Sequence, residues 1–183
     1  MGRISQPLPV KLMVPMFSGD EALFLVAESR LAEGFGPIDY RSGMLPFTHT
    51  SYYTPEFGLA LLRKFVAFKR LIDPCSLADV KHETNALEHE LASDGKRRIN
   101  LDPGYISQSK LVLATTKNHA HRIYLGKGIY AEVTLRYQNK AFRPWEWTYP
   151  DYRTEEYLEI LEEIRRIYVG QLRAGKASLS SDS

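Results

Sequence analysis

The chain has 183 residues, of which 44% are hydrophobic and 25% are charged, and its formal net charge at pH 7 is +2. This length is typical of one domain with its own core. The charge is milder than that of most nucleic-acid-binding domains, so nucleic acid is not favoured as a partner. The single cysteine, Cys75, excludes an internal disulfide and a thiolate metal site. No apolar run approaches the length of a membrane span, and the N-terminus lacks the apolar core of a secretory signal. We therefore expect a cytoplasmic protein without a membrane partner, with a single domain over residues 1–173 and a disordered polar tail over residues 174–183.

The start of the chain predicts a strand, a helix and two more strands. The apolar run Val10–Phe17 is typical of a strand, and Ser18 with a Glu three residues later predicts the capping box of a helix over residues 20–33. Residues 38–53 favour two strands joined as a hairpin, the second of which contains Ser51–Tyr53.

A long helix is predicted next, over residues 54–72. Thr54 is a suitable N-cap, and Pro55 suits the first helical position. Large apolar residues recur at roughly helical spacing and would form a buried stripe, namely Phe57, Leu61, Phe65, Phe68 and Ile72. Four basic residues would then lie elsewhere on the helix, as a solvated face: Arg63, Lys64, Lys69 and Arg70.

Two further helices are predicted over residues 76–92 and 154–172. Beside the apolar stripe of the first lie Lys81, Asn85 and Glu88, which either line a cleft at the edge of the core or form an ordinary polar helix flank. The element order predicts an α+β domain, with a mainly antiparallel sheet and helices packed on it. Its first half resembles a ferredoxin-like βαββα start.

Between these helices, strands are predicted over residues 110–116 and 120–136, the second interrupted by a turn at Gly126–Gly128. A three-residue loop with one glycine in the left-handed conformation pairs Leu125 with Ile129. One face of the hairpin is then apolar and continues through Ile123, Ala131, Val133 and Leu135. The opposite face carries Arg122, Tyr124, Tyr130, Glu132, Thr134 and Arg136, with Arg122 directly across from Glu132.

The Arg122–Glu132 pair has two interpretations. It is either an ordinary cross-strand ion pair or a pair beneath a cleft, where burial would shift its protonation equilibria. His121 falls on the apolar face and is expected to be buried and hydrogen-bonded, whereas His119 is freer. Nothing nearby completes a metal-ligand set with recognisable spacing, so we predict no metal site.

Turn residues and cations in the same region are typical of a small-molecule site. Asp102 begins an Asp-Pro-Gly-Tyr turn, which could aim a carboxylate as a base. Lys117, Arg122 and Lys127 could hold an anion, since Arg matches phosphate or carboxylate in a bidentate way. A P-loop, a GxSxG elbow and a CxxC motif are all absent. The aromatic residues near Pro144 and Pro150 would either pin a loop to the core or stack a ligand ring, namely Trp145, Trp147, Tyr149 and Tyr152.

Several sequence motifs resemble a known family. They include Asn100–Tyr105, Lys110–Lys117, His121–Leu125, Gly128–Leu135 and Trp147–Arg153, and upstream Phe35–Asp39 and Tyr52–Gly58. Together they resemble the prokaryotic family catalogued as domain of unknown function 4416, over nearly the whole chain. The resemblance implies a compact domain of about this length and carries no established activity.

These patterns lead to a primary hypothesis and two alternatives. The primary hypothesis is a pocket-bearing protein that binds, or acts as an enzyme on, a small anionic or phosphorylated ligand. Asp102 or Glu132 would be its acid or base, with His119 assisting, and the ligand-binding residues would be Lys117, Arg122, Tyr124, Tyr130, Asp151 and Arg153. The alternatives are an RNA-binding module that uses Tyr124, Tyr130 and Arg136 on the polar sheet face, and a non-catalytic interaction protein. No residue pattern identifies a cofactor or an oligomeric state.

Overall fold

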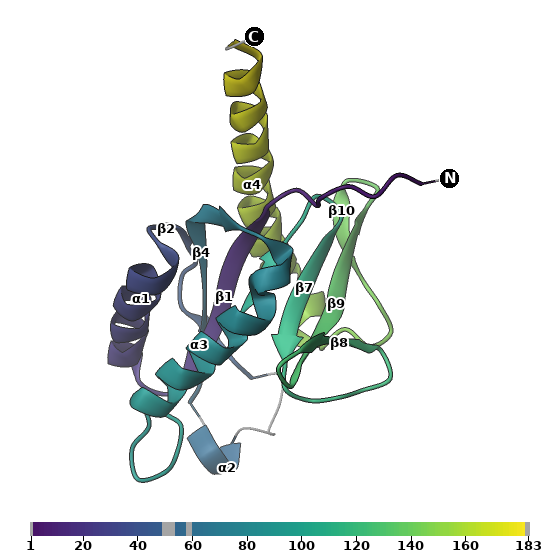
Figure 1. Cartoon of the computed structure of the whole chain (residues 1–183). Coiled ribbons are helices and arrows are strands. Elements are labelled where there is room, and N and C mark those ends of the chain that lie inside the picture. The colour runs from purple at the N-terminus through teal and green to yellow at the C-terminus, as the bar shows by residue number, and fades with distance from the viewer. Residues whose placement is uncertain (1, 49–53, 58–59, 182–183) are drawn as a thin grey trace.

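The computed structural model describes residues 2–48, 54–57 and 60–181 and shows a single antiparallel sheet flanked by helices (Figure 1). The strands are β1 Val10–Ser18, β2 Ile38–Arg41, β3 Leu45–Pro46, β4 Leu62–Ile72, β5 Ile99–Leu101, β6 Gly104–Ile106, β7 Lys110–Thr115, β8 Arg122–Gly126, β9 Ile129–Gln138 and β10 Ala141–Pro144. The helices are α1 Glu21–Phe35, α2 Thr54–Phe57, α3 Leu77–Glu90 and α4 Glu155–Ser181, with 3₁₀ turns η1 Pro74–Ser76 and η2 Asp151–Arg153. The α+β expectation is confirmed.

The central strand β1 is buried along its whole length because both faces of the sheet are covered. The strand order is β10-β9-β7-β6-β1-β4-β2, with β3 on β4, β5 on β1 and β8 on β9. On one face, Met13 of β1 packs in a cluster with the apolar side of α4. On the other face, its neighbours Leu12 and Val14 pack with α1 and α3. Period-two alternation therefore divides β1 between two cores.

The helix predicted over residues 54–72 is wrong beyond Phe57. Residues 62–72 form β4, which pairs with β1 on one side and with β2 and β3 on the other. Phe65 and Ala67 face α4, whereas Val66 and Phe68 face α1 and α3. A strand that is buried on both faces has no polar alternation, so its apolar residues resemble a helical stripe.

Other boundaries also differ from the prediction. Asp20, not Ser18, caps α1, since its carboxylate accepts a hydrogen bond from the Ala22 amide. The hairpin predicted over residues 38–53 does not form, because β2 and β3 each pair with β4 instead, and its Ser51–Tyr53 part lies outside the described residues.

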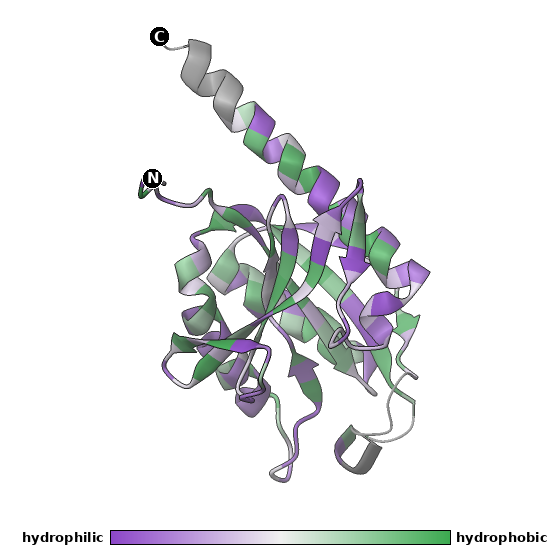
Figure 2. Cartoon of the chain, turned by 90° about the vertical axis from the view of Figure 1, so that its right-hand side faces the viewer, coloured by the Kyte–Doolittle hydropathy of each residue, from purple (hydrophilic) through white to green (hydrophobic). Residues whose placement is uncertain are grey.

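Helix α4 continues to Ser181, past its predicted end at Leu172, and extends beyond the sheet (Figures 1 and 2). The segment that was expected to be a disordered tail is therefore described as helix up to Ser181. Among the described residues, no helix is long and apolar enough to cross a membrane.

The predicted register of the β8–β9 hairpin is confirmed at Arg122 opposite Glu132 and at Ile123 opposite Ala131. A bulge near the turn places Gly126, not Leu125, opposite Ile129, and Gly126 and Gly128 adopt positive φ angles of 112° and 77°. The prediction of one buried apolar face is wrong for β8, where Ile123 is 69% exposed.

A second bulge, at Thr134, exchanges the faces of β9. Leu111 lies opposite Leu135 and Val112 lies opposite Val133, so Thr134 is an extra residue in β9. Val133 consequently packs with the start of α3, whereas Leu135 packs with α4. The two residues do not continue one apolar face, as the sequence had suggested. Arg136 therefore lies on the opposite face of the sheet from Tyr130.

The loop after β10 completes the edge of β9 between its two short partners. β8 pairs with residues 129–132 of β9 and β10 with residues 135–138. In the gap, the Val133 carbonyl accepts a hydrogen bond from the Trp147 indole at 3.1 Å, and the Thr134 carbonyl accepts one from the Thr148 hydroxyl at 2.6 Å. Side chains thus donate hydrogen bonds to the β9 carbonyls in this gap, where no strand pairs with them.

We predict that Gly104→Ala destabilises the fold by about 3 kcal/mol, the upper range for overpacking a core. A Cβ at Gly104 would lie 2.4 Å from the Val112 carbonyl oxygen and 2.6 Å from Cδ2 of Leu113, and β6 cannot move because it is held between β1 and β7. Gly43→Ala is the control, because nothing lies within 4 Å of its added Cβ. Urea denaturation of both variants measures the difference, and equal stabilities would contradict the prediction.

Candidate functional site

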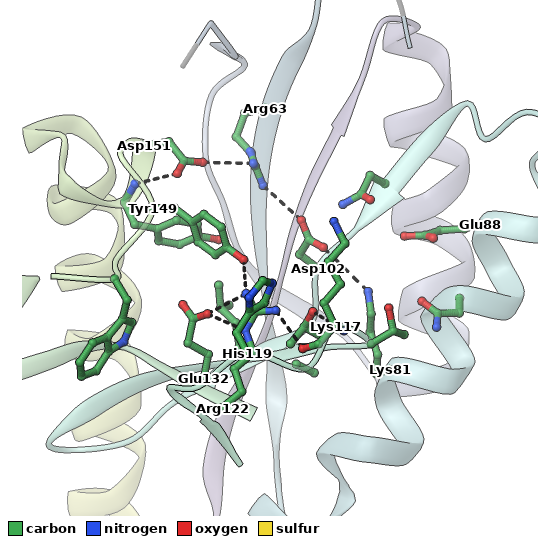
Figure 3. A pocket seen from close by; sticks show the side chains of 18 of the residues that line it. Arg63, Lys81, Glu88, Asp102, Lys117, His119, Arg122, Glu132, Tyr149 and Asp151 are labelled. Atoms are coloured by element: carbon green, nitrogen blue, oxygen red, sulfur yellow. Dashed lines mark hydrogen bonds and ion pairs between the residues drawn. The ribbon is translucent and has the colours of Figure 1, made fainter. Parts of the chain in front are cut away.

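A cavity of about 850 Å³ opens where β4, α3, β5, β7, the β8–β9 hairpin and the loop before η2 meet (Figure 3). This volume is typical of a small-molecule site. The cations that line it are Arg63, Lys81, Arg97, Lys117 and Arg122, and the carboxylates are Glu56, Glu88, Asp102, Glu132 and Asp151. Figure 3 labels these side chains, except Glu56 and Arg97, and shows them converging from opposite walls.

Arg63 forms the floor of the cavity. Its guanidinium lies 4.3 Å from the Phe47 ring centroid and 5.1 Å from that of Phe17. Nη2 donates to Asp151 at 3.3 Å, whereas Nη1 is 3.8 Å from Asp102, beyond hydrogen-bonding distance. Within the described part of the chain, Nη1 and Nε are buried and have no hydrogen-bond partner. The floor therefore presents a buried cation whose donors are only partly used.

Lys81 and Glu88 of α3 hold the strand end next to Asp102. Lys81 Nζ donates to the Leu101 carbonyl at 2.8 Å, and Glu88 accepts from the Leu101 amide at 2.5 Å. Burial raises the pKa of Glu88 above its ordinary value, and the nearby charge of Lys81 opposes this rise. Lys81 Nζ is also 3.8 Å from Asp102. The Asp102 carboxylate, 31% exposed, thus lies between two buried cations without a short contact to either.

Next to Asp102 on the same wall, Asn100 supplies another donor. It is 4% exposed, and its side-chain oxygen accepts from Arg97 at 2.9 Å. Its amide nitrogen Nδ2 is buried and has no hydrogen-bond partner among the described residues. An unsatisfied buried donor costs about 1–3 kcal/mol. This wall therefore favours a ligand that brings a hydrogen-bond acceptor to Asn100.

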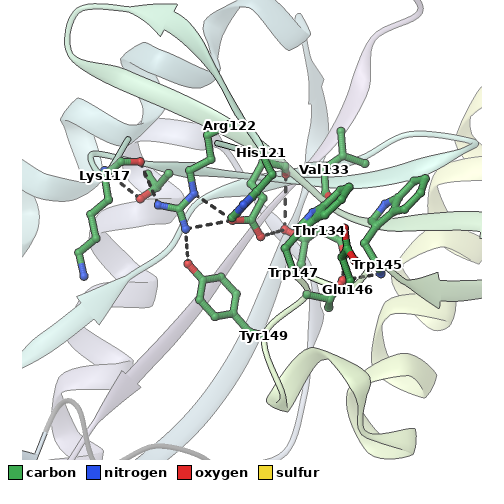
Figure 4. Close-up of polar contacts among 12 residues, drawn as sticks. Lys117, His121, Arg122, Val133, Thr134, Trp145, Glu146, Trp147 and Tyr149 are labelled. Carbon is green, nitrogen blue, oxygen red and sulfur yellow. Dashed lines mark hydrogen bonds and ion pairs between the residues drawn. The ribbon is translucent and has the colours of Figure 1, made fainter. Parts of the chain in front are cut away.

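The opposite wall is built around the Arg122–Glu132 pair (Figure 4). Glu132 Oε2 accepts from Arg122 Nε and from His121 Nε2, each at 3.0 Å. Arg122 Nη1 donates to the Lys117 carbonyl at 2.9 Å and Nη2 to the Tyr149 hydroxyl at 2.6 Å. The Arg122 and Glu132 side chains are only 3% and 2% exposed. All three guanidinium nitrogens of Arg122 already donate to protein oxygens. The Arg122–Glu132 pair therefore has a structural role in this wall.

Beside the Arg122–Glu132 pair, four aromatic rings form a column that ends at the cavity. The centroid distances are 5.1 Å from Trp145 to Trp147, 5.5 Å from Trp147 to His121 and 5.9 Å from His121 to His119. The rings are nearly parallel, with interplanar angles of 9°, 12° and 9°. The column supports the interpretation that these tryptophans pin the loop, since Trp147 also bonds the edge of β9. His121 is hydrogen-bonded as predicted but is 25% exposed.

The structure brings six of the predicted site residues to the cavity wall: Asp102, Lys117, His119, Arg122, Glu132 and Asp151. Tyr124 and Tyr130 pair elsewhere on the hairpin, and Tyr124 is 58% exposed. Arg153 donates to the carbonyls of residues 145, 146 and 148 and so fixes the loop. Lys127 forms an ion pair with Asp79 and does not line the cavity.

Several lining residues escaped the sequence-based site prediction, among them Arg63 and Asn100. Arg63 was assigned to the solvated face of a helix, and this error followed from the wrong secondary structure of β4. Asn100 carried no sequence signal beyond its place before the Asp102 turn. Lys81, Asn85 and Glu88, by contrast, line the cavity as one of their two interpretations suggested. Among the described residues, no group of three or more His, Cys, Asp or Glu could hold a metal ion.

We predict that Glu88→Gln becomes increasingly stabilising, relative to the unchanged chain, as the pH rises from about 4 to 7. The folded-state pKa of Glu88 is raised, so the folded state binds this proton more tightly, and the stability associated with the protonated form is lost as pH rises through that pKa. Gln keeps the acceptor for the Leu101 amide and does not ionise. Chemical denaturation at a series of pH values gives the difference, and a difference that is constant or shrinks with pH would contradict the assignment.

We further predict that Glu132→Ala costs about 3 kcal/mol or more, because it leaves the buried Arg122 guanidinium without its carboxylate. Glu146→Ala is the matched control, since Glu146 is exposed and its side chain forms no ion pair in the described part of the chain. The two unfolding free energies are compared in denaturant. A loss no larger for Glu132 than for Glu146 would show that the pair contributes little to the wall.

Comparison with known proteins identifies a family. Neither curated proteins nor solved structures gave a match to the chain. The family model described as domain of unknown function DUF4416 matches residues 8–168, which include every strand and all of the cavity-lining residues. The chain therefore belongs to the DUF4416 family.

Proposed function

We propose that the cavity binds a small anionic ligand, such as a phosphorylated metabolite, at the floor formed by Arg63, Lys81 and Asn100. The observation that carries this proposal is the set of buried donors with unused capacity: Arg63 Nη1 and Asn100 Nδ2 donate no hydrogen bond to any residue that the structure describes. Lys81 Nζ adds a third donor group, since an ammonium has three protons and only its bond to Leu101 is short. Ligand oxygens would satisfy these donors in a site shielded from water.

Asp102 is the group placed for acid–base chemistry on such a ligand. Its carboxylate faces the cavity, is partly exposed, and is not committed to a short hydrogen bond within the described residues. A carboxylate beside bound anion oxygens could take or return a proton on an adjacent ligand hydroxyl. His119, at the end of the ring column, lines the same cavity and could assist. We assign Arg122 and Glu132 a positioning role, because their polar atoms already bond to the protein.

We predict that Asn100→Asp weakens ligand binding, whereas Asp102→Asn preserves or strengthens it. The first change keeps the shape of the side chain but replaces the donor Nδ2 by a carboxylate oxygen. The affinity for an anion should therefore fall at least about 10-fold. The second removes a negative charge near the anion. A thermal-shift screen with sugar phosphates, nucleotides and carboxylates identifies the ligand, and titration of the variants gives the ratio of dissociation constants.

Asn139→Asp is the matched control for these titrations. It makes the same chemical change at an exposed position that does not line the cavity. The proposal fails if no anion in the screen raises the melting temperature. It also fails if Asn100→Asp binds the ligand as well as Asn139→Asp does.

A further inference from the structure

Positive charge is concentrated at the corner of the molecule formed by β7, β9, β10 and the C-terminal half of α4. Three neighbouring segments there, residues 106–116, 133–145 and 165–175, contain no Asp or Glu. Their cations are Lys110, Arg136, Lys140, Arg143, Arg165, Arg166 and Arg173. Since the whole chain has a net charge of +2, these seven cations leave the remainder at −5. We call this region the basic corner.

On one side of the sheet, three of these cations stand in a row across adjacent strands. Lys110 of β7 is the direct partner of Arg136 of β9, which is the direct partner of Arg143 of β10. None of the three forms an ion pair within the described residues, although Arg136 stacks on Trp145. Like charges directly opposite each other destabilise a sheet. Repulsion within the row therefore destabilises the protein alone, and a bound polyanion would relieve it.

On the other side of the sheet, the basic corner contains a groove between β9 and α4. Its lining residues are Tyr137, Glu162, Arg165, Arg166, Val169, Gly170 and Arg173. Arg166, Gly170 and Arg173 are spaced along one face of α4, and the missing side chain of Gly170 leaves open space between the two arginines. Glu162 is the one carboxylate in this lining, and it accepts a hydrogen bond from the Phe142 amide at 3.1 Å. Both sides of the β9–β10 edge are thus cationic.

Two arginines of the basic corner lie over aromatic rings. Arg165 Cζ is 3.3 Å from the Tyr137 ring centroid, and its nitrogens donate to the Gln108 carbonyl. Arg136 Cζ is 4.3 Å from the Trp145 centroid. Arg136 is also exposed, and unstacked RNA bases stack on arginine planes as they do on aromatic rings. Such platforms next to unpaired cations are suited to an unpaired nucleic-acid strand.

We propose that the basic corner binds single-stranded RNA, with Lys110, Arg136 and Arg143 contacting phosphates. The flat guanidinium platforms favour this partner over an acidic peptide, which has no rings to stack. This site is separate from the cavity, because the bulge at Thr134 places Arg136 on the opposite face of β9 from Glu132. The proposal therefore stands independently of the anionic ligand.

The test uses fluorescence anisotropy to measure the binding of the full chain to a fluorescent oligouridylate of about 12 nucleotides. The measurement is repeated over a range of salt concentrations. The variant carries Lys110→Gln, Arg136→Gln and Arg143→Gln. A matched control carries Arg30→Gln, Lys96→Gln and Lys127→Gln, which lowers the net charge equally at exposed positions on other elements. We expect the variant to bind at least about 10-fold more weakly and its log–log salt slope to fall by about 2, while the control loses little.

Arg143→Glu separates binding from folding. This reversal places a carboxylate opposite Arg136, so the melting temperature at low salt should stay equal or rise while RNA affinity falls. Competition with poly-glutamate and with duplex RNA of equal charge distinguishes the partner. The proposal is overturned if the chain binds no RNA at low salt, if the triple variant and its control weaken binding equally, or if poly-glutamate or duplex RNA competes better than the single strand.

Discussion

The buried guanidinium of Arg63 is the interaction on which the site depends. It joins segments that are far apart in the chain, because Phe17, Phe47, Asp102 and Asp151 all contact it. A cation removed from water must be compensated by charge and by ring faces, or the fold loses several kcal/mol. The need to compensate this one charge therefore brings the end of β1, the turn after β5 and the η2 turn to one point. The part of the Arg63 guanidinium that these partners leave uncovered forms the cavity floor.

Local pairing was predictable from the sequence, and burial on both faces was not. The hairpin register followed from alternation around Gly126–Gly128, since a slip of one residue would have exchanged its two faces. This placed Arg122 opposite Glu132 correctly. β4 lies between β1 and β2 with helices over both faces, so its sequence lacks the polar alternation that marks a strand. Missing β4 meant missing Arg63, although the acidic partner Asp102 was identified.

The bulge at Thr134 was equally invisible in the sequence, yet it decides which residues can act together. A bulge adds one residue to one strand and reverses the alternation beyond it. Before Thr134, Tyr130 and Glu132 lie on one face of β9, and Glu132 lines the cavity. After it, the polar residue Arg136 faces away, so a continuous surface of Tyr124, Tyr130 and Arg136 does not exist. A pattern of period two therefore holds only as far as the register is unbroken.

The mild net charge of the chain results from two unlike regions. Five carboxylates line the cavity, where several of them compensate cations that burial has removed from water. The five cations and five carboxylates of the cavity cancel each other, so the acidic residues that offset the basic corner lie elsewhere in the chain. A composition near neutrality is thus compatible with a strongly basic corner. Net charge indicates the partner of a protein only when the charges are evenly distributed, and in this chain seven cations lie in segments that contain no Asp or Glu.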